Sequence, residues 1–326
     1  MRTAEVFMIS FIIIGRNEGI KLKRCIESIL TAVTVNRLTD SEIIYVDSAS
    51  TDDSIERVKC YNRVRAFKIT GKANPAVARN VGAKEAHGDV LFFIDGDMEI
   101  RADFIPCVYN ENYGLKFNFV SGEIIDYYYD MNGRYLYSEL RYKIKKDRND
   151  EVTTGGLFLI KKNLWEKAGG MRSKYRVSED YDFGLRLAKA EVKLFRKCTV
   201  AAVHHTVNYK NRKRMWARIL NGDEFYLRGV LYRDHILNKY ILRLLFRTDY
   251  TLLLLLLSLF FFLLRWNIYV LLPYTALILL RSIPYYKIRT KTSFFIPVYF
   301  IFRDVSAIFS FILFFPKPKS IQYIPV

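Results

Sequence analysis

The sequence predicts an α/β protein in which a doubly wound, Rossmann-like sheet is followed by C-terminal membrane helices. Three observations lead to this prediction. Apolar runs rich in β-branched and aromatic residues alternate with helical patterns up to about residue 245. Each run ends in a polar turn, as expected at the carboxyl end of a strand buried on both faces. A leucine- and phenylalanine-rich segment then begins, and the chain combines 51% hydrophobic residues with a net charge of +18, which is unusual for a soluble domain.

Three strands are predicted within the first hundred residues, at positions 7–14, 43–46 and 90–94. They end at the sequences GRNEG, DSASTDD and DGD. Between the first two, residues 19–32 repeat apolar side chains on one face with helical spacing. Alternation of strands and helices predicts a parallel sheet that binds ligands at the carboxyl ends of its strands. All three polar sequences lie at such ends.

The predicted organisation has a sheet domain at residues 1–245 and a membrane region at residues 249–326. The two apolar stretches after residue 249 would measure about 50 Å as one helix, against a hydrocarbon core of about 30 Å. A helical hairpin at about 249–284, turning at 265–267, is therefore expected. The next apolar stretch, at about 294–315, contains Arg303 and Asp304, so it is expected to be an amphipathic or third membrane segment.

Basic residues flank the hairpin. Residues of a linker at about 210–248 carry clustered Lys and Arg, and Arg281, Lys287, Arg289 and Lys291 follow the second apolar stretch. Anionic lipid headgroups attract such segments, and the positive-inside rule predicts a cell-membrane protein whose sheet domain faces the cytoplasm. No nucleic-acid-binding motif accompanies the charge, so the expected partners are membrane lipids and no nucleic acid.

The first candidate site residues follow the first two strands. Asn17 and Glu18 come after the first strand, and Asp47 and Ser48 come at the end of the second. Adjacent strand ends place these side chains around one crevice. Asp47 is expected to accept a hydrogen bond from a nucleotide base or from a ribose hydroxyl.

Asp95 and Asp97 follow the third strand directly. Two carboxylates on one turn can divide their work between a ribose hydroxyl and a divalent cation held mainly by phosphate oxygens. A DxD sequence arises about once by chance in such a chain, and its place at a strand end is what favours this interpretation. Arg79, which lies upstream, is expected to pair with a diphosphate.

A third group lies at the predicted start of a helix, where Ser178 is expected to be the N-cap and Glu179 and Asp180 the first turn. The helix dipole favours ionised carboxylates there, as a catalytic base requires. The alternative is that these acidic residues only decorate a helix start. Gly156 is expected where the backbone passes close to a bound sugar, and His204 to complete a metal site or hold a phosphate.

Taken in order, IIIGRNEG, IIYVDSASTDDS, ARNVGA, FFIDGD, TTGGLFLI, SEDYDFGLRL and VHH resemble the family 2 glycosyltransferases, which have the GT-A fold. The resemblance covers about residues 8–225. It implies an inverting enzyme that uses a nucleotide-diphosphate sugar, with UDP or GDP expected, together with Mg²⁺ or Mn²⁺. Residues of about 1–100 would then hold the nucleotide sugar and those of about 101–225 the acceptor. By resemblance, Asn17, Glu18 and Asp47 line the nucleotide pocket, Asp95 and Asp97 form the metal and diphosphate motif, and Asp180 is the general base.

The expected function is transfer of one sugar to a glycan or lipid-linked acceptor at the cytosolic membrane face, in cell envelope polysaccharide biosynthesis. Processive members of the family carry a QxxRW sequence, and residues 212–216 contain no Gln, so repeated addition is not expected. Two alternatives remain. One is transfer to a polyprenyl phosphate, and the other is a catalytically silent membrane scaffold with the same fold.

Overall fold

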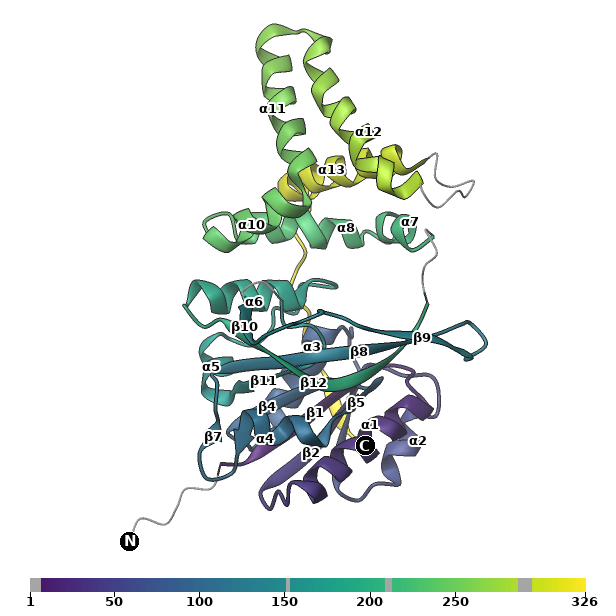
Figure 1. Cartoon of the computed structure of the whole chain (residues 1–326), viewed down its shortest axis with the longest axis vertical. Helices are drawn as coiled ribbons and strands as arrows, with labels where there is room; N and C mark the ends of the chain where they lie inside the picture. Colours follow the sequence, from purple (N-terminus) through teal and green to yellow (C-terminus); the bar gives the residue numbers. More distant parts are fainter. Residues whose placement is uncertain (1–6, 151–152, 209–212, 287–294) are drawn as a thin grey trace. The chain divides into compact units, whose positions relative to one another are not determined.

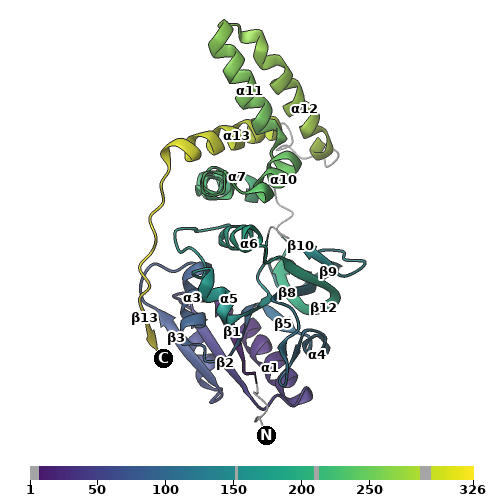
Figure 2. The ribbon, with the colours of Figure 1, turned by 90° about the vertical axis from the view of Figure 1, so that its left-hand side faces the viewer.

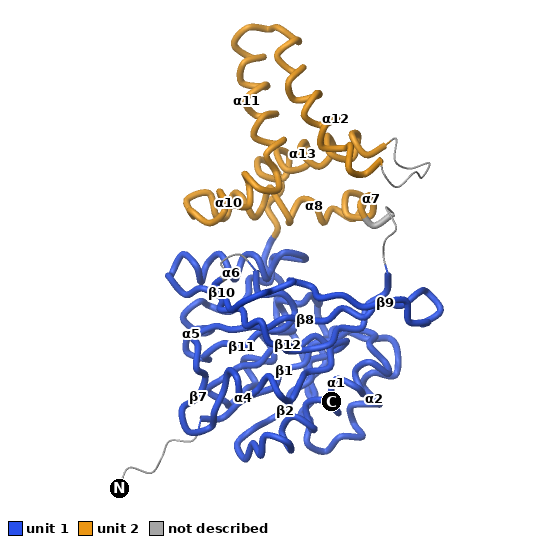
Figure 3. Tube along the Cα trace, viewed as in Figure 1, with its two compact units in different colours: residues 1–208, 317–326 blue, residues 209–316 orange. Residues whose placement is uncertain are grey.

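The computed structural model describes residues 7–150, 153–208, 213–286 and 295–326 (Figure 1). The chain divides into two compact units (Figure 3). Unit 1 contains residues 1–208 and 317–326, and unit 2 contains residues 209–316. This division differs from the predicted boundary near residue 245, because residues up to 248 group with the apolar helices and the C-terminal tail groups with the sheet.

Unit 1 contains a sheet whose centre is parallel and doubly wound. The parallel strands lie in the order β4-β1-β2-β3 and are β1 (Ile9–Gly15), β2 (Ser41–Asp47), β3 (Val64–Ile69) and β4 (Val90–Asp95). The helices that follow the first three are α1 (Ile20–Val35), α2 (Ser54–Lys59) and α3 (Pro75–Glu85). In the register, Gly15 pairs with Asp47 and Ile14 pairs with Asp95. The polar residues that end these strands therefore meet at one edge of the sheet.

The other half of the sheet adds antiparallel pairs, which the sequence patterns did not indicate. Strand β11 (Phe158–Lys161) runs antiparallel to both β4 and β8 (Phe119–Tyr129), and β12 (Leu194–Val207) lies parallel to β8. Helix α6 (Glu179–Lys189) precedes β12. This half of unit 1 also contains β5 (Met98–Ile100), a 3₁₀ turn (Ala102–Phe104), α4 (Ile105–Val108), β9 (Tyr135–Leu140), β10 (Arg148–Asp150) and α5 (Lys162–Lys167). Strands β6 (Tyr109–Asn110) and β7 (Gly114–Leu115) form a separate two-stranded sheet.

Strand β1 is apolar except for Ser10, and all of its residues are buried because both of its faces are covered. Phe11 packs in one cluster with Ile26 of α1, whereas Ile12 packs in a second cluster with Val77 of α3. Residues on alternate sides of the strand therefore enter different cores. This double burial holds the end of β1, and the polar turn after it, in a fixed position.

The C-terminal tail adds a strand to the opposite edge of the sheet. Strand β13 (Tyr323–Pro325) runs antiparallel to β3, and Tyr323 pairs with Ile69 (Figure 2). The ring of Tyr323 packs edge-on against Phe67, and its hydroxyl donates to Glu85 at 2.5 Å. Residues 317–326, predicted to belong to the membrane region, are thus part of the sheet unit.

Unit 2 is helical in the residues that the structure describes. Its elements are α7 (Lys213–Leu220), α8 (Asp223–Phe225), a π-helical turn (Tyr226–Val230), α9 (Leu231–Asp234), α10 (Lys239–Thr248), α11 (Tyr250–Arg265), a 3₁₀ turn (Ile268–Leu271), α12 (Leu272–Tyr286) and α13 (Ile296–Leu313). Two helical stretches are long and apolar enough to cross a membrane, Ile268–Tyr286 and Ile296–Leu313. A third is possible if α10 and α11, which bend by 91° at their junction, form one span.

Two sequence-based expectations fall partly outside the described residues. Among the basic residues predicted to follow the hairpin, Arg281 lies in α12 and donates to Thr251 at 2.7 Å. Lys287, Arg289 and Lys291 lie outside the described residues, as does Arg212 of the segment compared with QxxRW.

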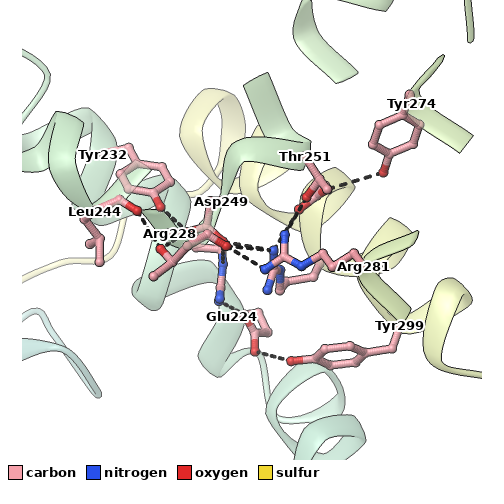
Figure 4. Close-up of polar contacts among 12 residues, drawn as sticks. Glu224, Arg228, Tyr232, Leu244, Asp249, Thr251, Tyr274, Arg281 and Tyr299 are labelled. Atoms are coloured by element: carbon pink, nitrogen blue, oxygen red, sulfur yellow. Dashed lines mark hydrogen bonds and ion pairs between the residues drawn. The ribbon is translucent and has the colours of Figure 1, made fainter. Parts of the chain in front are cut away.

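Charged side chains are buried inside unit 2 (Figure 4). Asp249 accepts contacts from Arg228 Nε and from Arg303 Nη2, each at 3.0 Å. The neighbouring Asp304 accepts a hydrogen bond from the Tyr274 hydroxyl at 3.4 Å. Arg303 and Asp304 are 5% and 0% exposed, so the charged pair in the middle of α13 is buried within unit 2.

Candidate active site

A pocket of about 570 Å³ opens in unit 1 at the carboxyl ends of β1, β2 and β4. The starts of α3 and α6 complete its wall. The structure thus brings together strand ends and helix starts from both halves of the sheet. The predicted site residues that line this pocket are Glu18, Ser48, Arg79, Asp95, Asp97, Gly156, Glu179 and Asp180.

Asn17 and Asp47 do not line the pocket. Asn17 has a φ of 59°, and its side-chain oxygen accepts a hydrogen bond from the Thr51 N–H at 2.8 Å. Asp47 is fully buried and accepts hydrogen bonds from the Tyr45 hydroxyl and the Ser50 N–H, at 3.0 and 2.8 Å. Both side chains hold the loop after β2 in place. The ligand contacts predicted for them stay predictions.

Glu18 lies beside the aspartates at the pocket floor. Burial, followed by the nearby negative charge of Asp97, raises the pKa of Glu18 to about 7. Ser54 Oγ accepts hydrogen bonds from the backbone N–H groups of Gly19 and Glu18, at 3.1 and 3.2 Å. This anchoring fixes the turn after β1 and, with it, the position of the Glu18 carboxyl group.

Arg79 connects two acidic groups that lie far apart in the sequence. Its Nη2 donates to Asp95 at 2.8 Å and its Nη1 donates to Glu179 at 3.1 Å, and the side chain is only 3% exposed. Its guanidinium pairs with two pocket carboxylates and links α3 to the start of α6. The predicted pairing of Arg79 with a diphosphate stays a prediction.

Gly156 is required by the position of Asp95. A Cβ atom on Gly156 would lie 1.8 Å from Asp95 Oδ2. The loop before β11 thus passes directly over this carboxylate, and no side chain fits between them. The close approach predicted for Gly156 exists, but the group that it approaches is Asp95. Its place beside a bound sugar stays a prediction.

His204 lies against Asp97. His204 Nε2 lies 3.2 Å from Asp97 Oδ2, and His204 Nδ1 lies 2.7 Å from Asp126 Oδ1. Arg141 also donates to Asp126, through Nη2 at 2.5 Å. Burial disfavours the charged form of His204, but hydrogen bonds to Asp126 and Asp97 outweigh it and raise its pKa to about 9. His205 points elsewhere and contacts Glu99 at 2.7 Å.

Asp97 and His204 fit a divalent cation. A carboxylate oxygen and an imidazole nitrogen converge there, and both are ligand types that Mn²⁺ accepts. Among the described residues no group of three His, Cys, Asp or Glu side chains forms a metal cluster, so other ligands would have to be substrate oxygens or water. An ion bound to His204 would replace the proton on Nε2, because imidazole binds metals in its neutral form.

Helix α6 begins as predicted, but its cap differs. Ser178 occupies the N-cap position with a φ of 70° and makes no side-chain cap hydrogen bond. This left-handed conformation is uncommon for a residue other than glycine. Glu179 and Asp180 fill the first turn, and Asp180 Oδ2 accepts a hydrogen bond from Thr153 at 2.6 Å. Burial and repulsion by Asp180 raise the pKa of Glu179 to about 7, against the opposing effect of Arg79.

The pocket residues that sequence reasoning missed include Asn74, Arg176 and Lys319. Asn74 caps α3 by accepting from the Val77 N–H, and its amide donates to the carbonyls of Ser173 and Tyr175. The N-cap preference for Asn before Pro75 was a usable signal. Lys319 belongs to the C-terminal tail, where no motif marks it.

Comparison with known proteins agrees with this geometry. The profile of the glycosyl transferase family 2 matches residues 10–169, which include the strands and loops that form most of the pocket. This segment therefore belongs to glycosyl transferase family 2, and the predicted family is confirmed.

Individual relatives extend the comparison. The chain is 31% identical to the glycosyltransferase GlyG of Streptococcus pneumoniae over 37% of its own length and 40% of that protein. It is 25% identical to an uncharacterized glycosyltransferase of Haemophilus influenzae, over 55% of its own length and 62% of the relative. The match thus spans between two fifths and about three fifths of these relatives.

A solved structure supports the fold. A crystal structure of GalNAc-T7 with UDP, GalNAc and Mn²⁺ superposes with a TM-score of 0.50 and 18% identity, over 63% of this chain and 45% of that one. Together with the mixed α/β sheet, this likeness confirms the predicted GT-A fold.

Proposed function

We propose that the protein is a metal-dependent, inverting glycosyltransferase that transfers one sugar from a nucleotide-diphosphate sugar to a glycan or lipid-linked acceptor. The observation that carries this proposal is the convergence of Asp95, Asp97 and Asp180 in one pocket, most of which is formed by the family 2 segment. His204 does not line the pocket itself and contacts Asp97 at 3.2 Å. The GalNAc-T7 crystal structure contains UDP and Mn²⁺, which supports UDP as the first nucleotide to examine. GDP is the second.

The pocket residues divide the proposed reaction among them. Asp180 accepts the proton of the acceptor hydroxyl as that oxygen attacks the anomeric carbon, in one displacement without a covalent sugar-enzyme intermediate. Asp97 and His204 would hold the divalent cation, whose chemistry is to stabilise negative charge on a leaving diphosphate. Arg79 keeps Asp95 and Glu179 in place by charge pairing. The silent-scaffold alternative gives these converging carboxylates no role.

Nucleotide binding that depends on a metal tests the proposal. We expect the full chain to bind either UDP or GDP in a panel that includes dTDP and CMP, with affinity raised by Mn²⁺. Asp97→Asn should remove most of the Mn²⁺ effect, because a neutral amide is a poorer ligand for a hard cation. Titration calorimetry with and without Mn²⁺ provides the measurement.

Asp103→Asn is the matched control, since Asp103 is an exposed aspartate of the same unit. It should bind nucleotide as the unaltered chain does. If folded protein bound none of the four nucleotides in the presence of Mn²⁺, the catalytic proposal would give way to the scaffold alternative.

We also propose that the α11–α12 hairpin crosses the cell membrane and that unit 1 faces the cytoplasm. Unit 1 includes residues on both sides of unit 2 in the chain. Pairing of β13 with β3 therefore requires both ends of unit 2 to lie on one side of the membrane, which allows only an even number of crossings. The buried charged pair of α13 supports α13 as the segment that stays on the side of unit 1.

Cysteine labelling on sealed inverted membrane vesicles measures this topology. In a background with Cys60, Cys107 and Cys198 replaced by serine, we expect a membrane-impermeant maleimide to label Ser320→Cys in the tail. Asn267→Cys at the hairpin turn should react only after detergent is added. Restoring Cys60, an exposed residue of unit 1, reports the side on which unit 1 lies. Labelling of Ser320→Cys and Cys60 from opposite sides would contradict the even number of crossings.

A further inference from the structure

The C-terminal tail carries a lysine into the wall of the candidate active site. Lys319 lines the same pocket as Asp95 and Asp180 although it follows the whole of unit 2 in the chain. The tail beyond it is held by β13 and by the Gln322 carbonyl, which accepts from the Thr70 N–H at 3.0 Å. The position of Lys319 is therefore set by the sheet.

The backbone of Lys319 is also held in place by Ser173. Its N–H donates to Ser173 Oγ at 2.9 Å, and the Ser173 hydroxyl donates back to the Lys319 carbonyl at 3.0 Å. The Ser173 carbonyl in turn accepts from Asn74. The tail is thus joined to both the start of α3 and the segment that leads to α6.

The side chain of Lys319 has capacity for a further ligand. Its Nζ donates to the Ala73 carbonyl at 3.2 Å, which uses one of the three N–H bonds of an ammonium group. Within the described part of the chain Lys319 forms no ion pair. The Lys319 side chain is half-buried. It lies near Asn74, at the N-terminal end of α3, where the free backbone N–H groups of the helix favour negative charge.

Other cations surround this amine. Burial lowers the pKa of Lys319, and the positive charges of Arg176 and Lys72 lower it further. Arg176 lines the pocket as well. The pocket wall thus carries the cationic side chains of Lys319 and Arg176 in addition to the carboxylates of Asp97 and Asp180. A phosphate group suits the Lys319 amine, because it accepts several charge-assisted hydrogen bonds at once.

We propose that Lys319 binds a phosphate group of the substrate, so that the C-terminal tail is a working part of the active site. This inference rests on the proposed function. The phosphate belongs either to the diphosphate of the nucleotide donor or to a phosphorylated lipid acceptor, and the chemistry of recognition is the same for both. A consequence is that the family 2 segment at residues 10–169 does not contain the complete binding site.

The test compares Lys319→Gln with Lys317→Gln in the full chain. Lys317 is an exposed lysine of the same tail and does not line the pocket. Calorimetry with UDP, GDP, inorganic pyrophosphate and farnesyl phosphate probes both phosphate sources, and uridine and guanosine serve as phosphate-free probes. We expect Lys319→Gln to weaken binding of at least one phosphate probe about tenfold, the order expected for one hydrogen bond to a charged group. Nucleoside binding and the Lys317→Gln variant should be unchanged.

The pattern of losses assigns the phosphate. A loss for UDP or GDP together with pyrophosphate supports the donor diphosphate, and a loss for farnesyl phosphate alone supports the acceptor. Lys319→Arg should retain binding in either case, because it keeps the charge, and this rescue separates ligand contact from misfolding of the tail.

Two results would overturn the inference and can be told apart from failure of the proposed function. Equal binding of every phosphate probe by Lys319→Gln and the unaltered chain overturns the role of Lys319 and leaves the transferase proposal intact. No binding of any probe by the unaltered chain overturns both. Binding of pyrophosphate through Lys319 without binding of a nucleotide supports the phosphate site and contradicts the transferase proposal.

Discussion

Replacing Asp180 with asparagine is expected to lower the rate of sugar transfer by about 10²–10⁴-fold, the range over which general bases contribute. Asparagine has the shape of aspartate and can still accept the hydrogen bond from Thr153 that holds Asp180 Oδ2 at 2.6 Å. It cannot take a proton from an acceptor hydroxyl. Nucleotide binding should therefore stay within about twofold of normal, and a transfer assay combined with calorimetry measures both quantities.

Glu166→Gln provides the control for this experiment, because Glu166 is exposed on α5. If Asp180→Asn retained transfer, the proton would have to go to another base. Glu179 is the neighbouring candidate, with a pKa raised to about 7 by burial. Its carboxylate accepts a hydrogen bond from Arg79 at 3.1 Å, however, and this contact would have to be given up for Glu179 to act as the base.

Replacing Arg79 with methionine is expected to destabilise unit 1 by about 3 kcal/mol, since breaking a buried ion pair leaves its partner charges uncompensated. Asp95 and Glu179 would both lose a guanidinium that lies 2.8 and 3.1 Å away. Asp95 would also lose its fixed position beneath Gly156. We therefore expect weaker nucleotide binding in addition to the lower free energy of unfolding.

The loss of stability should grow with pH. The pKa of Glu179 in the folded chain is about 7, above its ordinary value of 4.5, and removal of Arg79 raises it further. An acid whose folded pKa is raised loses stability as the pH rises from the unfolded pKa through the folded one. Both chains lose this stability alike up to about pH 7, so the difference between Arg79→Met and the unaltered chain should widen above about pH 7, as measured by denaturant unfolding.

Two variants make this prediction specific. Adding Glu179→Gln to Arg79→Met should recover part of the stability, because it removes one of the unpaired charges. Arg63→Met changes an exposed arginine of the same unit and should have little effect. If Arg79→Met lowered the free energy of unfolding by the same amount at every pH, lost packing and not lost charge pairing would be responsible.

Much of the site could be predicted because its residues follow buried strands. Asp95 and Asp97 come directly after the apolar part of β4, and Ser48 follows β2. In a doubly wound sheet the carboxyl ends of parallel strands gather at one edge, so local sequence position was enough to place them near each other. Glu179 and Asp180 were placed in the same way, from the start of a helix.

Local position did not reveal the partners of each side chain. Asp47 is at the expected strand end, but its sequence position did not indicate that its oxygens accept from Tyr45 and Ser50. Arg79 lies 100 positions from Glu179, and nothing in the spacing indicates that the two meet. Ser178 has a residue type that favours caps, but its left-handed backbone prevents the cap bond that was expected.

The sequence by itself determined strands β1, β2 and β4, the polar turns that follow them and the apolar hairpin, because each depends on the pattern of neighbouring residues. Strand β3 was not predicted from the sequence. Only the tertiary structure decided that Arg79 bridges two carboxylates, that His204 meets Asp97, and that the tail returns to β3. Lys319 contacts Ala73 across 246 positions, and such a contact depends on how the sheet edge, the loop before α3 and the tail pack together. No periodicity or motif encodes a contact of that kind.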